Sequence, residues 1–348
     1  MRRARPRPGL RDVEPYESPQ PKVAARLNTN ESPYPLPSGF RTDLARSIAD
    51  RALNRYPDRD ATAVRSRLAE LEHITVDRVW VANGSNEILL QLLQAYGGSE
   101  RRAVVFEPTY SMYARLGWVT GTDVVPIALE EPWRIDEGAI ERAREAEPHV
   151  IFVCSPNNPT GNLQDGSTIG ALAESDALVV VDEAYIEFGG QTVSGLIARY
   201  PNIVVVRTFS KAYALAGARI GFCVADPEVV VDLRRVRLPY HVSALTDAAG
   251  LAAIAHRGDA VTILETIRHE RDRILAELPP LGVRAFPSCA NFVLFRPPRD
   301  AGEVWRALLD RGVLVRDMTA SVPNALRVTA GTPAEIDLFL TSLREVLS

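Results

Sequence analysis

Only three cysteines occur among the 348 residues, at positions 154, 223 and 289, and no two of them form a CxxC pair. This scarcity excludes a dense disulfide framework and favours reduced thiols in a cytoplasmic protein. No apolar run reaches membrane-spanning length, and the basic, proline-rich first residues lack the apolar stretch of a signal peptide. The net charge of −4 gives no electrostatic reason to expect nucleic acid or a membrane as a partner.

Several motifs of common enzyme classes are also missing. The sequence contains no Walker loop, no strand followed by GxGxxG, no HExxH and no GxSxG. These absences exclude the usual signatures of nucleotide, dinucleotide, zinc-protease and serine-hydrolase sites. The five histidines show no metal-ligand spacing, so we predict no metal site.

Short apolar runs alternate with helix-like stretches between residues 78 and 224. The runs occupy residues 78–82, 103–107, 123–128, 149–154, 177–182, 202–207 and 219–224. Several are nearly continuous valine and isoleucine, which is typical of strands covered on both faces. We therefore predict an α/β fold with a three-layer, mainly parallel but mixed sheet, in which residues 219–224 form an antiparallel member.

The remaining segments predict a second, smaller α/β domain. A helix-rich stretch over residues 242–278 is followed by a tail that again alternates strands and helices and ends in a helix from about Pro333. We predict an N-terminal arm over residues 1–24 and a large domain over residues 46–254. Residues 25–45 and 255–348 are predicted to form the small domain.

Polar side chains follow three of the predicted strands at the points where these strands end. The segments are "SPNNPTG" (155–161), "DEAY" (182–185) and "TFSK" (208–211). Because ligands of open α/β sheets bind beyond the carboxyl ends of the strands, these segments predict a site at one sheet edge. Upstream, "ANGSNE" is a strand, a glycine turn and a helix start, where Ser85 and Asn86 can hold a phosphate with free N–H groups.

Lysine is rare in this chain. Two of the 40 basic residues are lysine, and the rest are arginine. Lys22 lies in the proline-rich arm and is interpreted as a solvated residue. Lys211 lies at a predicted strand end, and a lysine can lose its proton and form an imine with a carbonyl, which arginine effectively cannot. A pyridoxal phosphate site needs such an amine and a carboxylate at the pyridine nitrogen, a role that suits Asp182.

Eight motifs, in their order and at their separations, carry a resemblance to a known family. "SPNNPTG", "VVVDEAYIEF", "TFSKAYALAGARIG" and "LRVTAG" resemble the class I/II pyridoxal-phosphate-dependent aminotransferases of fold type I, the aspartate aminotransferase fold. "LNTNESPY", "RYPDRD", "ANGSNEILLQLL" and "RLPYHVS" are most similar to the histidinol-phosphate aminotransferase branch. The resemblance covers the chain from about residue 24 to residue 345.

The resemblance implies roles for the cofactor-binding residues. Lys211 is expected to bond to pyridoxal phosphate and to move the reacting proton, and Asp182 to bind the pyridine nitrogen. Asn158 and Tyr185 are expected at the ring hydroxyl oxygen. The expected phosphate ligands are Ser85, Asn86, Ser210 and Arg219, with Tyr110 stacked on the ring and Tyr56 reaching the phosphate of the neighbouring subunit. Many members of the branch carry aspartate where this chain has Asn86.

The resemblance also implies the substrates. Arg327 is expected to bind their acidic ends, and Asn30, Tyr16 and Tyr240 resemble further substrate-pocket residues. The implied reaction of this expected homodimer converts L-histidinol phosphate and 2-oxoglutarate into imidazole-acetol phosphate and L-glutamate, in histidine biosynthesis. Three alternatives remain open: an aromatic amino-acid (phenylalanine) aminotransferase, a threonine-phosphate decarboxylase, and a non-catalytic regulator that senses the cofactor.

Overall fold

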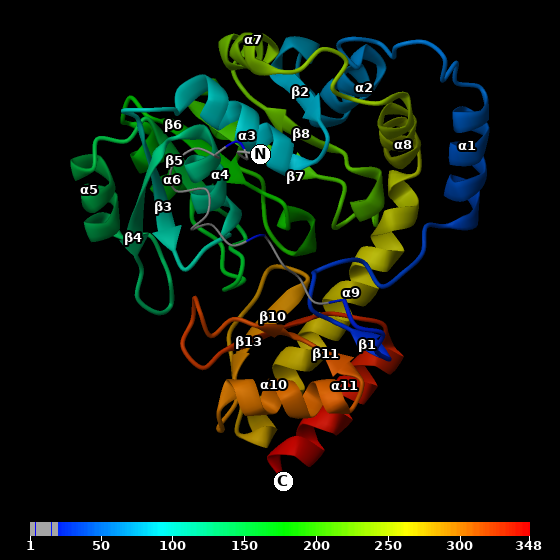
Figure 1. Ribbon diagram of the computed structural model, residues 1–348, viewed down its shortest axis with the longest axis vertical. Helices are drawn as coiled ribbons and strands as arrows, with labels where there is room; N and C mark the ends of the chain where they lie inside the picture. The colour runs from blue at the N-terminus through cyan, green and yellow to red at the C-terminus, as the bar shows by residue number, and fades with distance from the viewer. Residues whose placement is uncertain (1–3, 5–14, 16–19) are drawn as a thin grey trace.

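The computed structural model describes residue 4, residue 15 and residues 20–348. Its larger part contains a seven-stranded sheet with the strand order β2-β8-β7-β6-β5-β3-β4 (Figure 1). The strands are β2 (Val79–Ala82), β3 (Arg102–Glu107), β4 (Asp123–Ala128), β5 (Val150–Cys154), β6 (Leu178–Asp182), β7 (Ile203–Thr208) and β8 (Gly221–Val224). All pairings among β3 to β7 are parallel, whereas β8 is antiparallel to both β2 and β7. The predicted mixed sheet is confirmed.

Helices cover both faces of this sheet because alternate strand residues point to opposite sides. Val79 and Val81 belong to one apolar cluster, and Trp80 and Ala82 belong to another. The first cluster is completed by α2 (Thr62–Glu72), α5 (Glu137–Glu145), α6 (Gly166–Ala173) and α8 (Ala244–Ala255). The second is completed by α3 (Ser85–Tyr96), α4 (Met112–Thr120) and α7 (Pro227–Val236). β5 and β6 are buried at every position, and each fully buried valine contributes about 1.5–3 kcal/mol.

The C-terminal part forms a smaller four-stranded sheet with the order β12-β13-β10-β9. Its strands are β9 (Arg284–Ala285), β10 (Phe292–Arg296), β12 (Arg316–Asp317) and β13 (Leu326–Thr329). α10 (Ala301–Asp310) and α11 (Pro333–Leu347) pack with this sheet around one apolar cluster. α11 starts at Pro333, as predicted, because Thr332 and Glu335 form a reciprocal capping box.

The N-terminal segment crosses between the two parts of the molecule. β1 (Ala25–Arg26) pairs in parallel with β11 (Val313–Leu314) of the smaller part, whereas α1 (Ser38–Ala49) packs against α8. Phe40 of α1 is buried in the core of the large sheet. We therefore propose a domain division in which the small domain begins near residue 25 and the chain enters the large domain before Ser38, earlier than residue 45.

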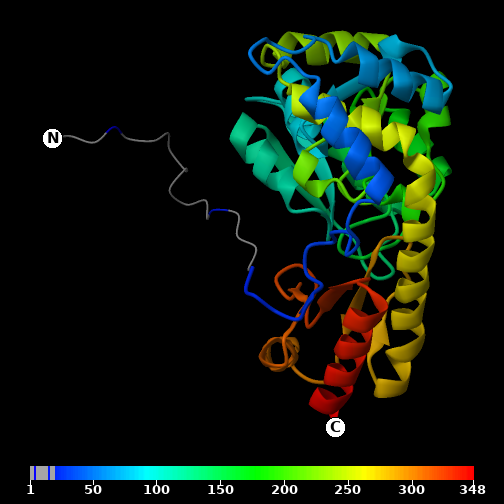
Figure 2. The same cartoon turned by 90° about the vertical axis from the view of Figure 1, so that its right-hand side faces the viewer.

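The long helix α9 (Arg257–Glu277) joins the two parts (Figure 2). It begins beside α8 and runs along the small domain next to α11. Arg268 and Arg271 of α9 both donate to the carbonyl oxygen of Phe188, at 3.2 and 2.9 Å. Because Phe188 lies three residues after Tyr185, these bonds tie α9 to the predicted site.

Three further features bear on the expectations from sequence. Among the described residues, no helix combines the length and the apolar character needed to cross a membrane. In the same part of the chain, no three histidine, cysteine, aspartate or glutamate side chains gather into a possible metal site. Cys154, Cys223 and Cys289 are all free thiols.

Candidate active site

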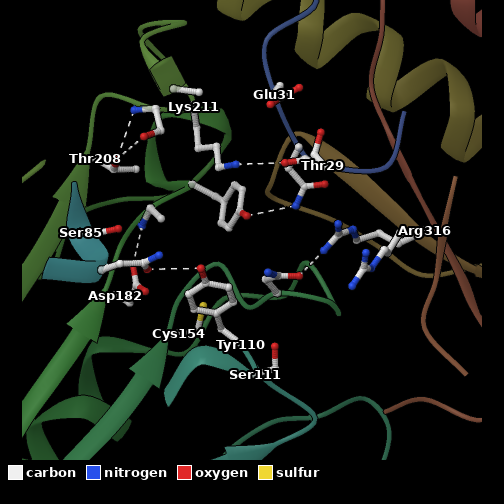
Figure 3. Close-up of a pocket in the computed structure, with 18 of the residues that line it drawn as sticks. Thr29, Glu31, Ser85, Tyr110, Ser111, Cys154, Asp182, Thr208, Lys211 and Arg316 are labelled. Atoms are coloured by element: carbon white, nitrogen blue, oxygen red, sulfur yellow. Dashed lines mark hydrogen bonds between the residues drawn. The ribbon is translucent and has the colours of Figure 1, made fainter. Parts of the chain in front are cut away.

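A cavity of about 360 Å³ opens where β5, β6 and β7 end. The small-domain side closes it with residues 28–31 and with side chains of β12 and β13. Eleven of the fourteen residues predicted for the site line it: Asn30, Ser85, Asn86, Tyr110, Asn158, Asp182, Tyr185, Ser210, Lys211, Arg219 and Arg327. Figure 3 shows Lys211 and Asp182 on neighbouring segments of the large domain, with Arg316 on the opposite wall.

Lys211 projects into this cavity from the segment after β7. Its Nζ donates a hydrogen bond of 3.2 Å to the carbonyl oxygen of Thr29 and lies 5.8 Å from the centre of the Tyr185 ring. Burial lowers the pKa of this amine to about 8, and the positive charges of Arg327 and Arg219 act in the same direction. The amine is therefore partly unprotonated near neutral pH, which a nucleophile and proton acceptor requires.

Asp182 ends β6 and is almost fully buried. Its Oδ2 accepts a hydrogen bond of 2.8 Å from the Tyr113 hydroxyl, and its Oδ1 accepts one of 3.1 Å from the backbone N–H of Ala184. Burial raises the pKa of the carboxyl to about 6, although both hydrogen bonds oppose this shift. The Tyr113 ring is itself stacked on Phe152, with centroids 4.7 Å apart. A carboxylate held this way favours a positively charged partner in the cavity.

The raised pKa of Asp182 predicts a stability effect in the cofactor-free protein. Because the pKa of Asp182 is about 6 in the folded state and that of an ordinary aspartate is 3.8, the folded state binds more protons between pH 4 and 6. The free energy of unfolding therefore falls as the pH rises through this window, by about 3 kcal/mol. Asp182→Asn removes this dependence, so we expect the variant to be more stable than wild type by about 1–3 kcal/mol at pH 8.

Urea unfolding of both cofactor-free proteins at pH 4 and at pH 8 measures this difference. We expect the advantage of Asp182→Asn at pH 8 to disappear at pH 4, where the wild-type carboxyl is protonated. An advantage of equal size at both pH values would show that the buried charge is not its cause.

The start of α3 forms a close-packed cradle with Arg219. Gly84 precedes the helix with φ of 85°, and a Cβ there would lie 2.7 Å from Nη2 of Arg219. A Cβ on Gly221 would lie 2.6 Å from the backbone nitrogen of Ser85. Both glycines therefore allow the guanidinium and β8 to approach the first N–H groups of α3. These N–H groups have no partner within the helix and carry its positive dipole end, which suits an anion such as phosphate.

Ser210 and Tyr110 border the cradle. The Oγ of Ser210 accepts a hydrogen bond of 3.0 Å from the hydroxyl of Thr208, which also accepts the Ser210 backbone N–H at 3.1 Å. Tyr110 donates to Oδ1 of Asn86 at 3.3 Å and lies edge-on to Tyr113, with centroids 5.5 Å apart. The asparagine side chain is thus already bonded to the ring predicted to stack on the cofactor.

Arg327 projects from β13 and is held by two acceptors. Its Nη1 donates to Oδ1 of Asn158 at 2.5 Å, and its Nη2 donates to the carbonyl oxygen of Asn28 at 2.8 Å. The guanidinium also lies 5.1 Å from the centre of the Phe292 ring. These contacts fix the fork in the cavity wall, so little side-chain entropy remains to be lost when it binds an anion.

Asn30 lines the cavity, but its amide is bonded within the protein. Nδ2 donates to the Tyr185 hydroxyl at 3.0 Å, and Oδ1 accepts from the hydroxyl of Thr329 at 3.0 Å. Sequence reasoning expected Asn30 to contact substrate. The structure shows that its side chain also bonds to Tyr185 and Thr329, and contact with the substrate stays a prediction.

Two predicted residues of the described part of the chain do not line the cavity. Tyr56 and Tyr240 stack on each other outside it, with ring centroids 4.5 Å apart, and Tyr56 is 80% exposed. Tyr240 is 39% exposed. Tyr16 lies outside the residues that the structure describes.

Sequence reasoning missed several residues of the site. Arg316 lies opposite Arg327 in the antiparallel pair of β12 and β13 and lines the same cavity. Tyr113 donates a hydrogen bond to the predicted residue Asp182, and Thr208 donates one to the predicted residue Ser210. Tyr113 lies three residues after the predicted Tyr110, but its hydrogen bond to Asp182 spans 69 residues, so no local signal marks it. Arg316 lies in the predicted run "VLVRD", but nothing in that run distinguishes it from a surface arginine.

The donor set fits pyridoxal phosphate. The cavity combines an amine of lowered pKa, a buried carboxylate, a phenol, an amide and an anion cradle too tight for a Cβ at Gly84 or Gly221. The amine matches the aldehyde of this cofactor, and the carboxylate matches its pyridine nitrogen. The phenol and the amide match its ring hydroxyl, and the cradle matches its phosphate.

Comparisons with known proteins agree with this fit. Residues 23–343 match the family model for aminotransferase class I and II. The histidinol-phosphate aminotransferase of Streptomyces avermitilis is 47% identical, covering 97% of this chain and 95% of that protein. The histidinol-phosphate aminotransferase of Frankia casuarinae is 45% identical, covering 98% of this chain and 90% of that protein.

A solved structure supports the same assignment. Histidinol-phosphate aminotransferase from Sinorhizobium meliloti, in complex with pyridoxal-5'-phosphate, superposes with a TM-score of 0.85 at 25% identity. The match covers 94% of this chain and 91% of that one. The resemblance carried by the sequence motifs is confirmed. The chain therefore belongs to the class I and II aminotransferases and is a pyridoxal-phosphate-dependent enzyme of fold type I.

Proposed function

We propose that this enzyme transfers the amino group of L-histidinol phosphate to 2-oxoglutarate, which yields imidazole-acetol phosphate and L-glutamate in histidine biosynthesis. The observation that carries the proposal is the pair of arginines, Arg316 and Arg327, on the cavity wall opposite Lys211. Arginine binds phosphate and carboxylate oxygens alike, and these are the acidic groups of the two substrates. The two curated relatives with 45% and 47% identity carry the name of this activity.

The proposal assigns the cofactor to the large-domain side of the cavity. Asp182 binds the pyridine nitrogen, and Asn158 and Tyr185 bind the ring oxygen. Ser85, Asn86, Ser210 and Arg219 hold the phosphate, and Tyr110 stacks on the ring. When bound, pyridoxal phosphate supplies an electron-withdrawing ring that stabilises negative charge on the substrate carbon next to the amino group.

Lys211 performs the proton transfers in this proposal. With a pKa lowered to about 8, its Nζ accepts the proton from the substrate α-carbon as general base and returns a proton as general acid. The Asp182 carboxylate keeps the ring nitrogen protonated, because a buried negative charge favours a cation beside it. Arg327, fixed by Asn158 and Asn28, orients the acidic end of each substrate.

A panel of amino-group donors tests the substrate. Rates are measured for histidinol phosphate, phenylalanine and threonine phosphate, each with 2-oxoglutarate, and carbon dioxide release is followed in parallel. We expect the highest kcat/KM with histidinol phosphate, since it alone joins an aromatic ring to a phosphate that two arginines can bind. A clear preference for phenylalanine would replace the substrate by an aromatic amino acid. Carbon dioxide released from threonine phosphate would indicate a decarboxylase, and no turnover with any donor would favour a cofactor sensor.

We further propose that the working unit is a homodimer in which Tyr56 reaches the cofactor phosphate of the partner subunit. The support is the exposed Tyr56–Tyr240 stack, together with the exposed side chains of Leu53 and Leu238, which are close to these two tyrosines in the sequence. Such a group is unusual on a surface that faces only water. Tyr240 then contributes to the site from this shared surface.

Mixing two inactive variants tests the shared site. In a mixed dimer of Lys211→Ala with Tyr56→Ala, one site has both defects and the other has neither. We expect random re-assortment to restore about a quarter of wild-type activity, because half of the dimers are mixed and each has one intact site. Activity that equals only the mean of the two separate variants would show that Tyr56 serves its own subunit.

A cytoplasmic location is part of the proposal. Burial raises the pKa of both Cys154 and Cys223 to about 12, and neither thiol is paired. Free thiols persist in a reducing compartment. Cell fractionation with an antibody against the chain would test the location.

A further inference from the structure

Thr329, Asn30 and Tyr185 form a chain of hydrogen bonds behind the predicted cofactor site. The backbone N–H of Asn30 donates to Oγ1 of Thr329 at 3.1 Å, and Oγ1 donates to Oδ1 of Asn30 at 3.0 Å. Nδ2 of Asn30 then donates to the Tyr185 hydroxyl at 3.0 Å. The chain joins β13, the N-terminal segment and the loop after β6, and Asn30 and Thr329 are only 2% and 4% exposed.

The direction of each bond in this chain is fixed by chemistry. Oγ1 of Thr329 accepts the Asn30 backbone N–H, and within residues 20–348 the Asn30 amide is the acceptor that the structure gives to the proton of this hydroxyl. That proton requires the amide oxygen on its side, and the amide NH₂ must therefore face Tyr185. Asn30 is held further by its carbonyl oxygen, which accepts from Nδ2 of Asn291 at 3.2 Å. The asparagine consequently has one amide orientation.

This orientation determines what the phenol of Tyr185 can do. An NH₂ group cannot accept, so the Tyr185 oxygen is the acceptor and its proton is left for another partner. Within residues 20–348, the structure gives that proton no acceptor, and the side chain lines the cavity. Burial raises the pKa of Tyr185, so the hydroxyl keeps its proton and acts as a donor.

We propose that Thr329 is a positioning residue that acts through Asn30 and commits the Tyr185 hydroxyl to donate into the cofactor cavity. The inference rests on the proposed function, in which Tyr185 bonds to the cofactor ring oxygen. Removing the Thr329 hydroxyl makes the two amide orientations nearly equivalent, because each then leaves one amide group without a partner. In the flipped orientation the amide oxygen accepts the Tyr185 proton, and the phenol no longer donates to the cofactor.

The pH midpoint of the visible spectrum of the bound cofactor reports this donation. A proton donated to the ring oxygen stabilises negative charge there and favours the deprotonated form of the lysine-bound cofactor. Losing the donor raises the midpoint. The charged side chains facing Tyr185 are Lys211 and Arg327, with Cys154 and Tyr110 as its titratable neighbours, and all four are left unchanged by the test.

Four variants of the holoenzyme carry the experiment: Thr329→Val, Thr329→Ser, Tyr185→Phe and the Thr329→Val/Tyr185→Phe double variant. Valine keeps the shape of threonine without its hydroxyl, and serine keeps the hydroxyl without the methyl group. We expect valine to raise the midpoint by about half a unit to one unit and serine to leave it near the wild-type value. Tyr185→Phe should raise it at least as much as valine, and the double variant should match Tyr185→Phe alone.

Two outcomes would overturn the inference. If valine shifts the midpoint equally with tyrosine or phenylalanine at position 185, then Thr329 does not act through Tyr185. If serine behaves as valine does, packing of the methyl group is the cause and not the hydroxyl. Should Thr329→Val fail to fold by circular dichroism, Thr329→Ala replaces it in the same cycle. A wild-type enzyme that binds no cofactor would instead refute the proposed function itself, and the two failures are thus distinguishable.

Discussion

Lys211→Ala is expected to reduce kcat at least about 10⁴-fold, which is the largest effect of any single substitution in this chain. The variant loses the amine that bonds to the cofactor and the group that moves the proton at the substrate α-carbon. No other lysine can substitute, because Lys22 is the only other one in the sequence and lies in the N-terminal arm. Residual turnover should come only from binding and orientation of the substrate by the rest of the site.

Lys211→Arg should lose almost as much activity, even though it retains the positive charge. Arginine does not deprotonate in proteins, whereas the pKa of Lys211 is lowered to about 8 by burial and by Arg327 and Arg219. The reaction therefore requires a side-chain amine that can lose its proton, and a permanent positive charge at this position is not sufficient. This explains why one position keeps lysine in a chain that otherwise uses arginine.

Borohydride reduction followed by mass spectrometry provides the measurement that is independent of turnover. We expect one reduced cofactor adduct, on Lys211, in the wild type and in the matched control Lys22→Arg. Neither Lys211 variant should carry it. An adduct on Lys22, or normal turnover without any adduct, would contradict the assignment of Lys211.

Arg327→Ala is expected to lower kcat/KM by about 10²-fold or more for both histidinol phosphate and glutamate. Arg327 is 6% exposed and its guanidinium is held by Asn158 and Asn28, so it forms a fixed binding group for either acidic end. Its removal also leaves the acceptor Oδ1 of Asn158 without this donor. A substrate that binds through this fork loses two charge-assisted hydrogen bonds.

Arg316→Ala distinguishes the two acidic ends. The Arg316 side chain has no hydrogen bond or ion pair within the described part of the chain, and it lies opposite Arg327 across the β12–β13 pair. A phosphate offers more oxygens than a carboxylate, so we expect Arg316→Ala to weaken histidinol phosphate more than glutamate. The exposed Arg311, changed to alanine, serves as the control on the same domain. An effect of Arg327→Ala on only one substrate would refute the shared binding group.

The pH dependence of kcat provides a second test of the Arg327→Ala variant. The positive charge of Arg327 is one cause of the lowered pKa of Lys211. Its removal should raise that pKa, so the basic group controlling kcat should titrate at higher pH in Arg327→Ala than in the wild type. Arg316→Ala should not move this titration, since Arg316 is not among the groups that shift Lys211.

Much of the cofactor site could be predicted from the sequence because a parallel sheet brings the ends of successive strands to one edge. The segments at 155–161, 182–185 and 208–211 each follow a buried strand, and the structure places all three around one cavity. The antiparallel β8 was predicted from a similarly local feature, the short connection before it, and the final helix from Pro333 was predicted as well. The position of each of these site segments could be predicted because it depends only on which strand the segment follows.

The sequence by itself determined the α/β fold, the lysine and carboxylate of the site, and the family. Only the tertiary structure decided which side chains form hydrogen bonds with the residues of the site. Tyr113 bonds to Asp182 across 69 residues, and Thr329 bonds to Asn30 across 299. The family resemblance assigned Asn30 to the substrate pocket, and no local feature of the sequence indicates the bonds of its side chain to Tyr185 and Thr329. Hydrogen bonds are short-ranged and directional, so contacts between distant segments are known only once the two domains are packed together.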